Sequence, residues 1–126
     1  MIYGIGTDIV SVARMESSLE RFGKRFVERV LAESEKAGFE KTIKKANYLA
    51  KRFAAKEAAV KAMGTGFIDG IALSQVSVGH DEKGKPLLQF QGKAADVYEE
   101  LGIGDSHISI SDERDYAVAF VTLLKK

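Results

Sequence analysis

The residues best suited to chemistry are two acidic side chains that lie far apart in the sequence. Asp8 ends the segment GIGTD, and Glu57 stands in the middle of an alanine-rich run. Because side chains alternate sides along a strand, Gly4, Gly6 and Asp8 would share one side, with room beside the carboxylate for another helix or a ligand. Asp8 and Glu57 together would supply hard oxygen ligands suited to magnesium, with water and substrate phosphates completing the shell. The alternative is that Asp8 helps to cap a helix that begins near Ser11.

The alanine-rich run over 47–63 predicts the clearest helix of the chain. Lys61 lies one turn beyond Glu57, so the two side chains can share one edge of this helix. Lys56 falls inside the apolar stripe, where burial of its charge is costly unless a partner or a ligand satisfies it. The alternative is an ordinary ion pair between Glu57 and Lys61, with the Lys56 ammonium extended into solvent.

A small glycine-rich segment, Gly64-Thr65-Gly66, follows this helix directly. Glycines allow a close approach of the backbone, and adjacent amides can receive phosphate oxygens. The same segment could instead do no more than terminate the helix.

The periodicities predict one domain over 1–126 with an α+β fold, in which an antiparallel sheet packs against helices that include one long central helix. The expected strands cover 2–10, 71–78, 86–90, 107–111 and 116–124. The expected helices are a first one from Ser11 to Gly23, followed by 24–31, 47–63 and 93–101. The charged stretch 34–45 stays unassigned.

Composition narrows the classes of function. The 19 Lys and Arg residues against 18 Asp and Glu residues give a net charge of +1, without the strongly basic signature of a general nucleic-acid binder. There is no cysteine, which excludes disulfides, thiolate catalysis and zinc–thiolate sites, and two histidines are too few for a histidine-rich metal site. No apolar run approaches the roughly 20 residues needed to span a bilayer. We therefore expect a soluble, cytoplasmic protein with no membrane or nucleic-acid partner.

Five segments together resemble one enzyme family. GIGTDIV near the N-terminus is followed by RFAAKEAAVKAMGTG, then by GKP, HISISDE and YAVA. This combination is similar to the holo-acyl-carrier-protein synthases, the small trimeric branch of the 4′-phosphopantetheinyl transferase superfamily. The resemblance runs from Tyr3 to about Val121, and its two widely spaced parts, G-x-D and F-x-x-K-E-x-x-x-K, are specific as a pair. It implies the 4′-phosphopantetheinyl transferase fold and a homotrimer with active sites at subunit interfaces.

The resemblance also implies a reaction. A serine hydroxyl of apo acyl carrier protein would attack the β-phosphorus of coenzyme A and release adenosine 3′,5′-bisphosphate, with Mg²⁺ as cofactor. Asp8 and Glu57 would bind the metal together with the pyrophosphate, and Lys61 would contact the pyrophosphate. The serine proton would go to a water on the metal, to a carboxylate or to His107, and these alternatives stay open.

Further positions match coenzyme-binding positions of the family. They are the basic residues Arg52 and Lys56, the phosphate-side loop of Gly64, Thr65 and Gly66, the nucleotide-bordering hairpin segment of Gly84, Lys85 and Pro86, and His107 near the phosphates. The larger monomeric branch has another acidic ligand two residues after the aspartate, where this chain has Val10, so a water would replace it. Without the family resemblance, the alternative is that His107 is an ordinary strand residue and that Lys85 and Pro86 only form a turn.

The first helix carries a basic face. Arg14 and Arg21 project away from the apolar stripe of this helix, and Arg25 extends the basic character into the next segment. Such a face would steer and orient an acidic acyl carrier protein, and in relatives this helix receives the carrier. The alternative is a solvated face balanced by Glu16, Glu20 and Glu28.

Two other functions stay open from the sequence. A non-catalytic coenzyme A or nucleotide-binding module would keep the glycine loop and the basic residues, but it would not need Asp8 and Glu57. A protein-interaction domain built on the basic first helix would explain neither carboxylate.

Overall fold

The computed structural model describes residues 1–68 and 70–126, and it confirms an α+β fold with antiparallel strands. Three strands form one sheet in the order β1–β5–β4, and two others form a separate hairpin, β2–β3. The strands are β1 (Ile2–Ser11), β2 (Val76–His80), β3 (Pro86–Phe90), β4 (Ile103–Asp112) and β5 (Tyr116–Lys125). The helices are α1 (Val12–Phe22), α2 (Lys24–Val30), α3 (Lys36–Lys41), α4 (Lys45–Met63) and α5 (Gly92–Glu100), with short 3₁₀ turns η1 (Glu33–Glu35) and η2 (Leu73–Gln75). None of these helices is both long enough and apolar enough to cross a membrane.

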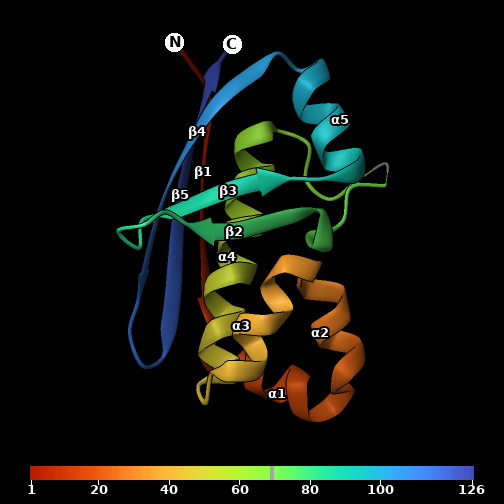
Figure 1. Cartoon of the computed structure of the whole chain (residues 1–126), viewed down its shortest axis with the longest axis vertical. Helices are drawn as coiled ribbons and strands as arrows, with labels where there is room; N and C mark the ends of the chain where they lie inside the picture. The colour runs from red at the N-terminus through yellow and green to blue at the C-terminus, as the bar shows by residue number, and fades with distance from the viewer. Residues whose placement is uncertain (69) are drawn as a thin grey trace.

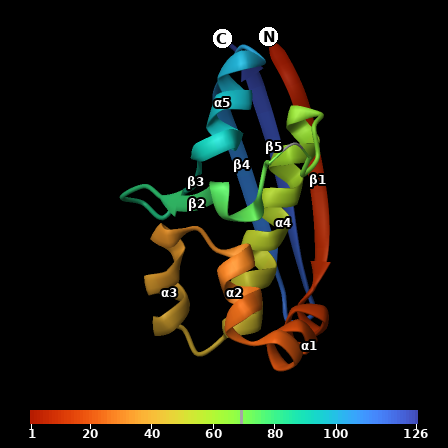
Figure 2. The ribbon, with the colours of Figure 1, turned by 90° about the vertical axis from the view of Figure 1, so that its right-hand side faces the viewer.

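The long helix α4 runs along one face of the three-stranded sheet (Figures 1 and 2). Helices α1, α2 and α3 gather at one end of it, and α5 lies at the other end. The hairpin β2–β3 also contacts α4 and continues towards β4. The other elements are therefore arranged around α4, which is the helix that carries most of the predicted site residues.

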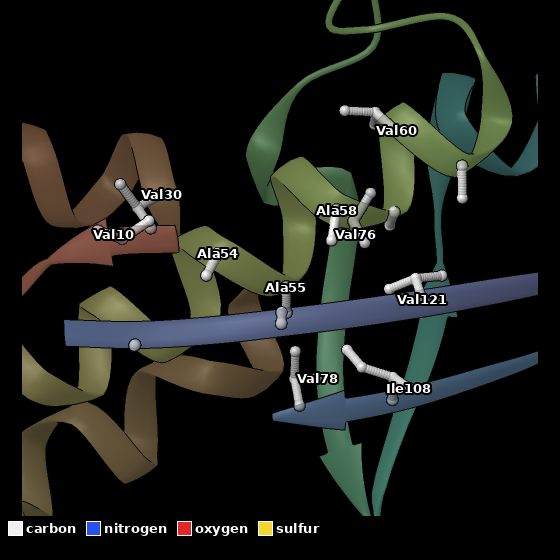
Figure 3. Packing of buried hydrophobic residues seen from close by; sticks show 14 of the residues in the cluster. Val10, Val30, Ala54, Ala55, Ala58, Val60, Val76, Val78, Ile108 and Val121 are labelled. Carbon is white, nitrogen blue, oxygen red and sulfur yellow. The ribbon is translucent and has the colours of Figure 1, made fainter. Parts of the chain in front are cut away.

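Alanines let α4 contact its neighbours on several faces. Ala54, Ala55, Ala58 and Ala59 are fully buried. Figure 3 shows Ala58 beside Val76 of β2, and Ala55 beside strand β5, which carries Val121. Small side chains leave the helix backbone open to close packing, so α4 is buried against both the sheet and the hairpin.

Strand β1 lies very close to α4 because glycines face the helix. A Cβ atom added to Gly4 would lie 2.1 Å from the carbonyl oxygen of Ala62, and one added to Gly6 would lie 2.0 Å from that of Ala58. No side chain tolerates such distances, so only glycine fits at these two positions. The alternation expected from the sequence is thereby confirmed, and the strand brings Asp8, on the same side, to the surface of α4.

Ser11 begins helix α1, as the sequence predicts. Its hydroxyl accepts a hydrogen bond from the Arg14 amide at 3.3 Å. Asp8 is therefore not the cap of this helix, and its carboxylate bonds elsewhere. The other end of α1 differs from expectation: Phe22 belongs to the apolar stripe by its spacing, but it is 51% exposed because the chain turns at Gly23 into α2.

Some element boundaries also differ from expectation. The strand expected over 71–78 starts late, because the Gln75 side chain accepts a hydrogen bond from the Ala72 amide at 3.4 Å and holds this segment in the turn η2. The strand expected over 107–111 is longer, since its first residues pair with the end of β5. The unassigned stretch 34–45 contains α3.

Gly6→Ala should destabilise the fold strongly. The added methyl group would overlap the backbone of α4, which cannot rotate away as a side chain can, so we expect the free energy of unfolding to fall by about 3 kcal/mol. Gly79→Ala is the matched control, since nothing lies within 4 Å of an atom added there in β2. Urea denaturation measures both variants, and equal stabilities would contradict the close contact between β1 and α4.

Candidate active site

The Lys61 ammonium joins helix α4 to strand β1. It donates a hydrogen bond to the Asp8 carboxylate at 3.0 Å and another to the Thr7 carbonyl oxygen at 3.0 Å. These bonds cross between two elements, whereas the helix alone suggested an ion pair along its own edge. Two of the four residues expected to be catalytic, which are Asp8, Glu57, Lys61 and His107, are thus in direct contact.

Glu57, another of these residues, lies one turn before Lys61 on α4. The negative charge of Asp8 acts on its carboxylate. The pKa of Glu57 is raised, first by burial and then by the negative charge of Asp8, and the positive charges of Lys61 and Arg14 oppose the rise. Two carboxylates that repel each other in a partly buried place favour a bound cation, because the cation removes the repulsion.

The donor set fits a magnesium ion that is shared with a substrate. Asp8 and Glu57 offer carboxylate oxygens from two separate elements, and magnesium prefers hard oxygen ligands of this kind. Within residues 1–68 and 70–126, no three His, Cys, Asp or Glu side chains are grouped so that they could hold a metal by themselves. Water and phosphate oxygens would therefore complete the coordination shell.

Gly64, Thr65 and Gly66 end helix α4. Gly64 has a left-handed backbone with a φ of 81°, and the amides of the three residues donate to the carbonyl oxygen of Val60 at 3.1, 3.3 and 3.4 Å. These bonds terminate the helix, which is the alternative that the sequence left open. A contact between these amides and a phosphate stays a prediction.

The position of Lys56 corrects an expectation drawn from the family. Its side chain is fully buried, and its ammonium donates to the Glu35 carboxylate and to the Val30 carbonyl oxygen, both at 2.5 Å. Burial lowers the pKa of Lys56, and the charge of Glu35 opposes that shift. A side chain with no exposed surface has nothing to offer to coenzyme A, and it does not extend into solvent either.

Arg52 lies near Lys56 and is also mostly buried. Its guanidinium stacks on the Tyr48 ring, 3.5 Å from the ring centroid, and its Nε lies 3.8 Å from the Glu35 carboxylate. Burial lowers the pKa of Arg52, and the neighbouring Tyr48 and Glu35 oppose the change. Only 9% of the residue is exposed, so its expected contact with the coenzyme has little surface to use.

His107 and Asp8 lie on opposite faces of the sheet. His107 pairs with Thr122 of β5, and Thr122 pairs with Ile5 of β1, so these three side chains share one face. That face points away from α4, because the glycines of β1 occupy the face towards the helix. Within one chain, the sheet therefore separates His107 from the Asp8 carboxylate.

Gly84, Lys85 and Pro86 lie at the turn of the hairpin β2–β3. The Asp81 carboxylate accepts hydrogen bonds from the amides of Lys83 and Lys85 at 2.8 and 2.9 Å, and Gly84 has a φ of 85°. Turn chemistry thus accounts for the local conformation. The Lys85 side chain is exposed, and its contact with the nucleotide stays a prediction.

The three arginines of the basic face, Arg14, Arg21 and Arg25, are all exposed. The Arg14 guanidinium lies over the Phe53 ring, 5.6 Å from the centroid, and it is near enough to Glu57 to influence its pKa. A groove of about 320 Å³ lies beside this face, lined by Phe22, Arg25, Phe26 and Arg29. The basic face therefore borders the carboxylate site and includes exposed aromatic surface.

Glu35 is the residue near the site that the sequence patterns do not predict. It lies in the unassigned charged stretch, yet it is only 3% exposed and is bonded to Lys56. The available signal was Lys56 itself, because a lysine inside an apolar stripe requires a buried acidic partner. Nothing local indicates which acidic residue supplies it.

Known proteins resemble this chain over almost its whole length. The family model of the 4′-phosphopantetheinyl transferase superfamily matches residues 4–121. A holo-[acyl-carrier-protein] synthase of Halorhodospira halophila is 54% identical over 124 residues, with 98% of each chain covered. The crystal structure of holo-[acyl-carrier-protein] synthase from Neisseria meningitidis has a TM-score of 0.94 and 45% identity, covering 99% of this chain and 100% of that one. The Helicobacter pylori synthase in complex with coenzyme A has a TM-score of 0.82 and 31% identity, covering 94% and 98%. With its carboxylate pair on β1 and α4, the chain belongs to the 4′-phosphopantetheinyl transferase superfamily, among its holo-[acyl-carrier-protein] synthases.

Proposed function

We propose that this chain transfers the 4′-phosphopantetheine group of coenzyme A to a serine of apo acyl carrier protein, with Mg²⁺ bound by Asp8 and Glu57. The observation that carries the proposal is the meeting of Asp8, Glu57 and Lys61 between β1 and α4. A module that only binds coenzyme A would need no such pair of carboxylates. The Helicobacter pylori relative with coenzyme A bound supports the choice of substrate. The cytoplasm is the proposed location.

The reaction forms a bond between the serine oxygen and the β-phosphorus of coenzyme A. The bond from that phosphorus to the bridging oxygen breaks, its electron pair leaves with adenosine 3′,5′-bisphosphate, and the serine proton goes to a base. Bound magnesium supplies charge neutralisation at the pyrophosphate oxygens. Lys61 holds the Asp8 carboxylate in place and brings positive charge to the leaving phosphate, where negative charge develops.

Asp8→Asn and Glu57→Gln should each lower the rate of transfer by about 10³-fold or more, because each removes one charged metal ligand and keeps the shape of the side chain. The assay combines apo carrier protein, coenzyme A and magnesium, with and without chelator, and detects the adduct by mass spectrometry. Glu100→Gln, at an exposed position of α5, is the matched control.

Two results would contradict this assignment. Near-normal turnover of either variant at saturating magnesium would show that the substituted residue is not a metal ligand. Binding of coenzyme A by the wild-type chain without formation of any adduct would favour a non-catalytic module.

The exposed arginines of α1 and α2 form the proposed docking face for the acyl carrier protein. Arg14 borders Glu57, so a carrier held there would have its serine beside the carboxylate site. Arg25 adds positive charge at a groove that also contains exposed aromatic surface. Arginine and aromatic residues are enriched where proteins bind each other, and a basic face suits an acidic partner.

Arg14→Glu combined with Arg21→Glu should raise the Michaelis constant of the carrier about tenfold or more, because reversed charges repel an acidic partner. The Michaelis constant of coenzyme A should change much less. Lys93→Glu, an equal charge reversal on α5 at the opposite end of the molecule, is the control. Steady-state kinetics with each substrate varied in turn measures both constants, and equal effects on the two would argue against this docking face.

The outer face of the three-stranded sheet is the proposed contact between three copies of the chain. Ile5, Ile9, Val118 and Phe120 expose between 36% and 62% of their surface. The register places Ile9 opposite Val118, so these side chains form neighbouring rows on one face. Apolar surface of this extent on a sheet favours association. His107 lies on the same face, which supports an active site shared between subunits of a homotrimer.

Phe120→Lys should dissociate the assembly, because a lysine buried between copies lacks a partner. Light scattering of the wild type should give three times the mass of one chain, and the variant should give the mass of a single chain. Leu87→Lys, an exposed apolar position on β3 rather than on this sheet, is the control and should stay trimeric. A monomeric wild type would refute the trimer.

A further inference from the structure

Glu35 is a buried point at which three elements meet. Its carboxylate accepts hydrogen bonds from the Lys56 ammonium of α4 at 2.5 Å, from the Val78 amide of β2 at 2.9 Å and from the Ala32 amide beside η1 at 2.9 Å. Its main-chain carbonyl accepts a further bond from the Tyr48 hydroxyl at 2.5 Å. One acidic side chain, 3% exposed, thus links the helix of the carboxylate site to the hairpin β2–β3.

The Lys56 side of this pair is equally constrained. The ammonium is fully buried and bonds both to Glu35 and to the Val30 carbonyl oxygen. Lys56 immediately precedes Glu57, so the two side chains leave α4 in directions about 100° apart. Fixing Lys56 against Glu35 therefore fixes the rotation of the helix that aims Glu57 towards Asp8.

Stability alone does not account for a buried ion pair at this position. Replacing such a pair by well-packed apolar side chains is often neutral or stabilising, since the charges lose their hydration. The pair instead fixes the orientation of the elements that it joins. The hydrogen bonds of Glu35 and Lys56 form only in one geometry, whereas apolar contacts tolerate small shifts.

We propose that Glu35 and Lys56 are positioning residues that hold α4 and the hairpin β2–β3 in one fixed arrangement for the transfer reaction. The hairpin is a separate two-stranded sheet, and the bond from Val78 to Glu35 ties its β2 edge to the helix. This role rests on the proposed function, in which Glu57 holds the metal and the segment from Gly84 to Pro86 borders the nucleotide. Small displacements of either would misplace coenzyme A relative to the metal.

The informative variant is the double substitution Glu35→Gln with Lys56→Met. Each single substitution leaves one charge buried without its partner and should lower the melting temperature. The double variant should recover only part of the loss, because a glutamine amide can accept from just one of the Ala32 and Val78 amides and the Val30 carbonyl oxygen loses its donor. In the double variant we expect kcat to fall about 10²-fold, the effect of a displacement near 1 Å in an active site. The KM of coenzyme A should rise more than the KM of the carrier, because Arg14 and Arg21 of the docking face stand on α1, whereas Lys56 bonds α2 at its last residue, Val30.

Ile103→Ala is the matched control for lost stability. It creates a cavity at a buried position of β4, a strand that carries neither Glu35 nor Lys56, and lowers the melting temperature. Loss of folded protein alone reduces the maximal rate and leaves both KM values unchanged, so the rise in the KM of coenzyme A is specific to positioning.

Wild-type kcat and KM values in the double variant would overturn the positioning role. Glu57→Gln in the same assay separates this failure from failure of the proposed function. If Glu57→Gln transfers normally, the metal assignment on which the role depends is itself wrong.

Discussion

The close contact between strand β1 and helix α4 is the constraint on which the site depends. Only glycine fits at Gly4 and Gly6, so the strand backbone lies directly against the helix backbone. Asp8, two residues further on the same side, then reaches Lys61 and repels Glu57. The proposed metal would be held by only two carboxylates of the chain, so both must be carried on rigid elements, and this contact supplies that rigidity.

The parts of the structure that the sequence predicts are those with local causes. Ser11 and Gly23 mark the ends of α1 through capping and chain reversal, and Gly64 marks the end of α4. The side of β1 on which Asp8 lies follows from alternation alone. Because these signals act over a few residues, the central helix, the first strand and the side of that strand on which Asp8 lies can be predicted from the sequence.

The features that could not be predicted depend on contacts between distant segments. Lys56 finds its partner Glu35 21 positions away, in a stretch whose pattern favours no element. The face occupied by His107 depends on the register of β4 against β5, which no local signal sets. Family resemblance assigned both residues to the coenzyme, while in one chain Lys56 is buried against Glu35 and His107 lies on the sheet face opposite to Asp8.

The difference between the two faces of β1 also controls which strand pairings are possible. A shift of the register by one residue turns every side chain to the other face. Ile5 would then be forced against α4 at a position held by Gly4 or Gly6, where even a single added carbon does not fit, and Asp8 would be lost from the helix side. A sheet with β1 shifted by one residue therefore cannot pack against α4. The glycines that allow Asp8 to reach the helix also exclude this wrong register while the sheet assembles.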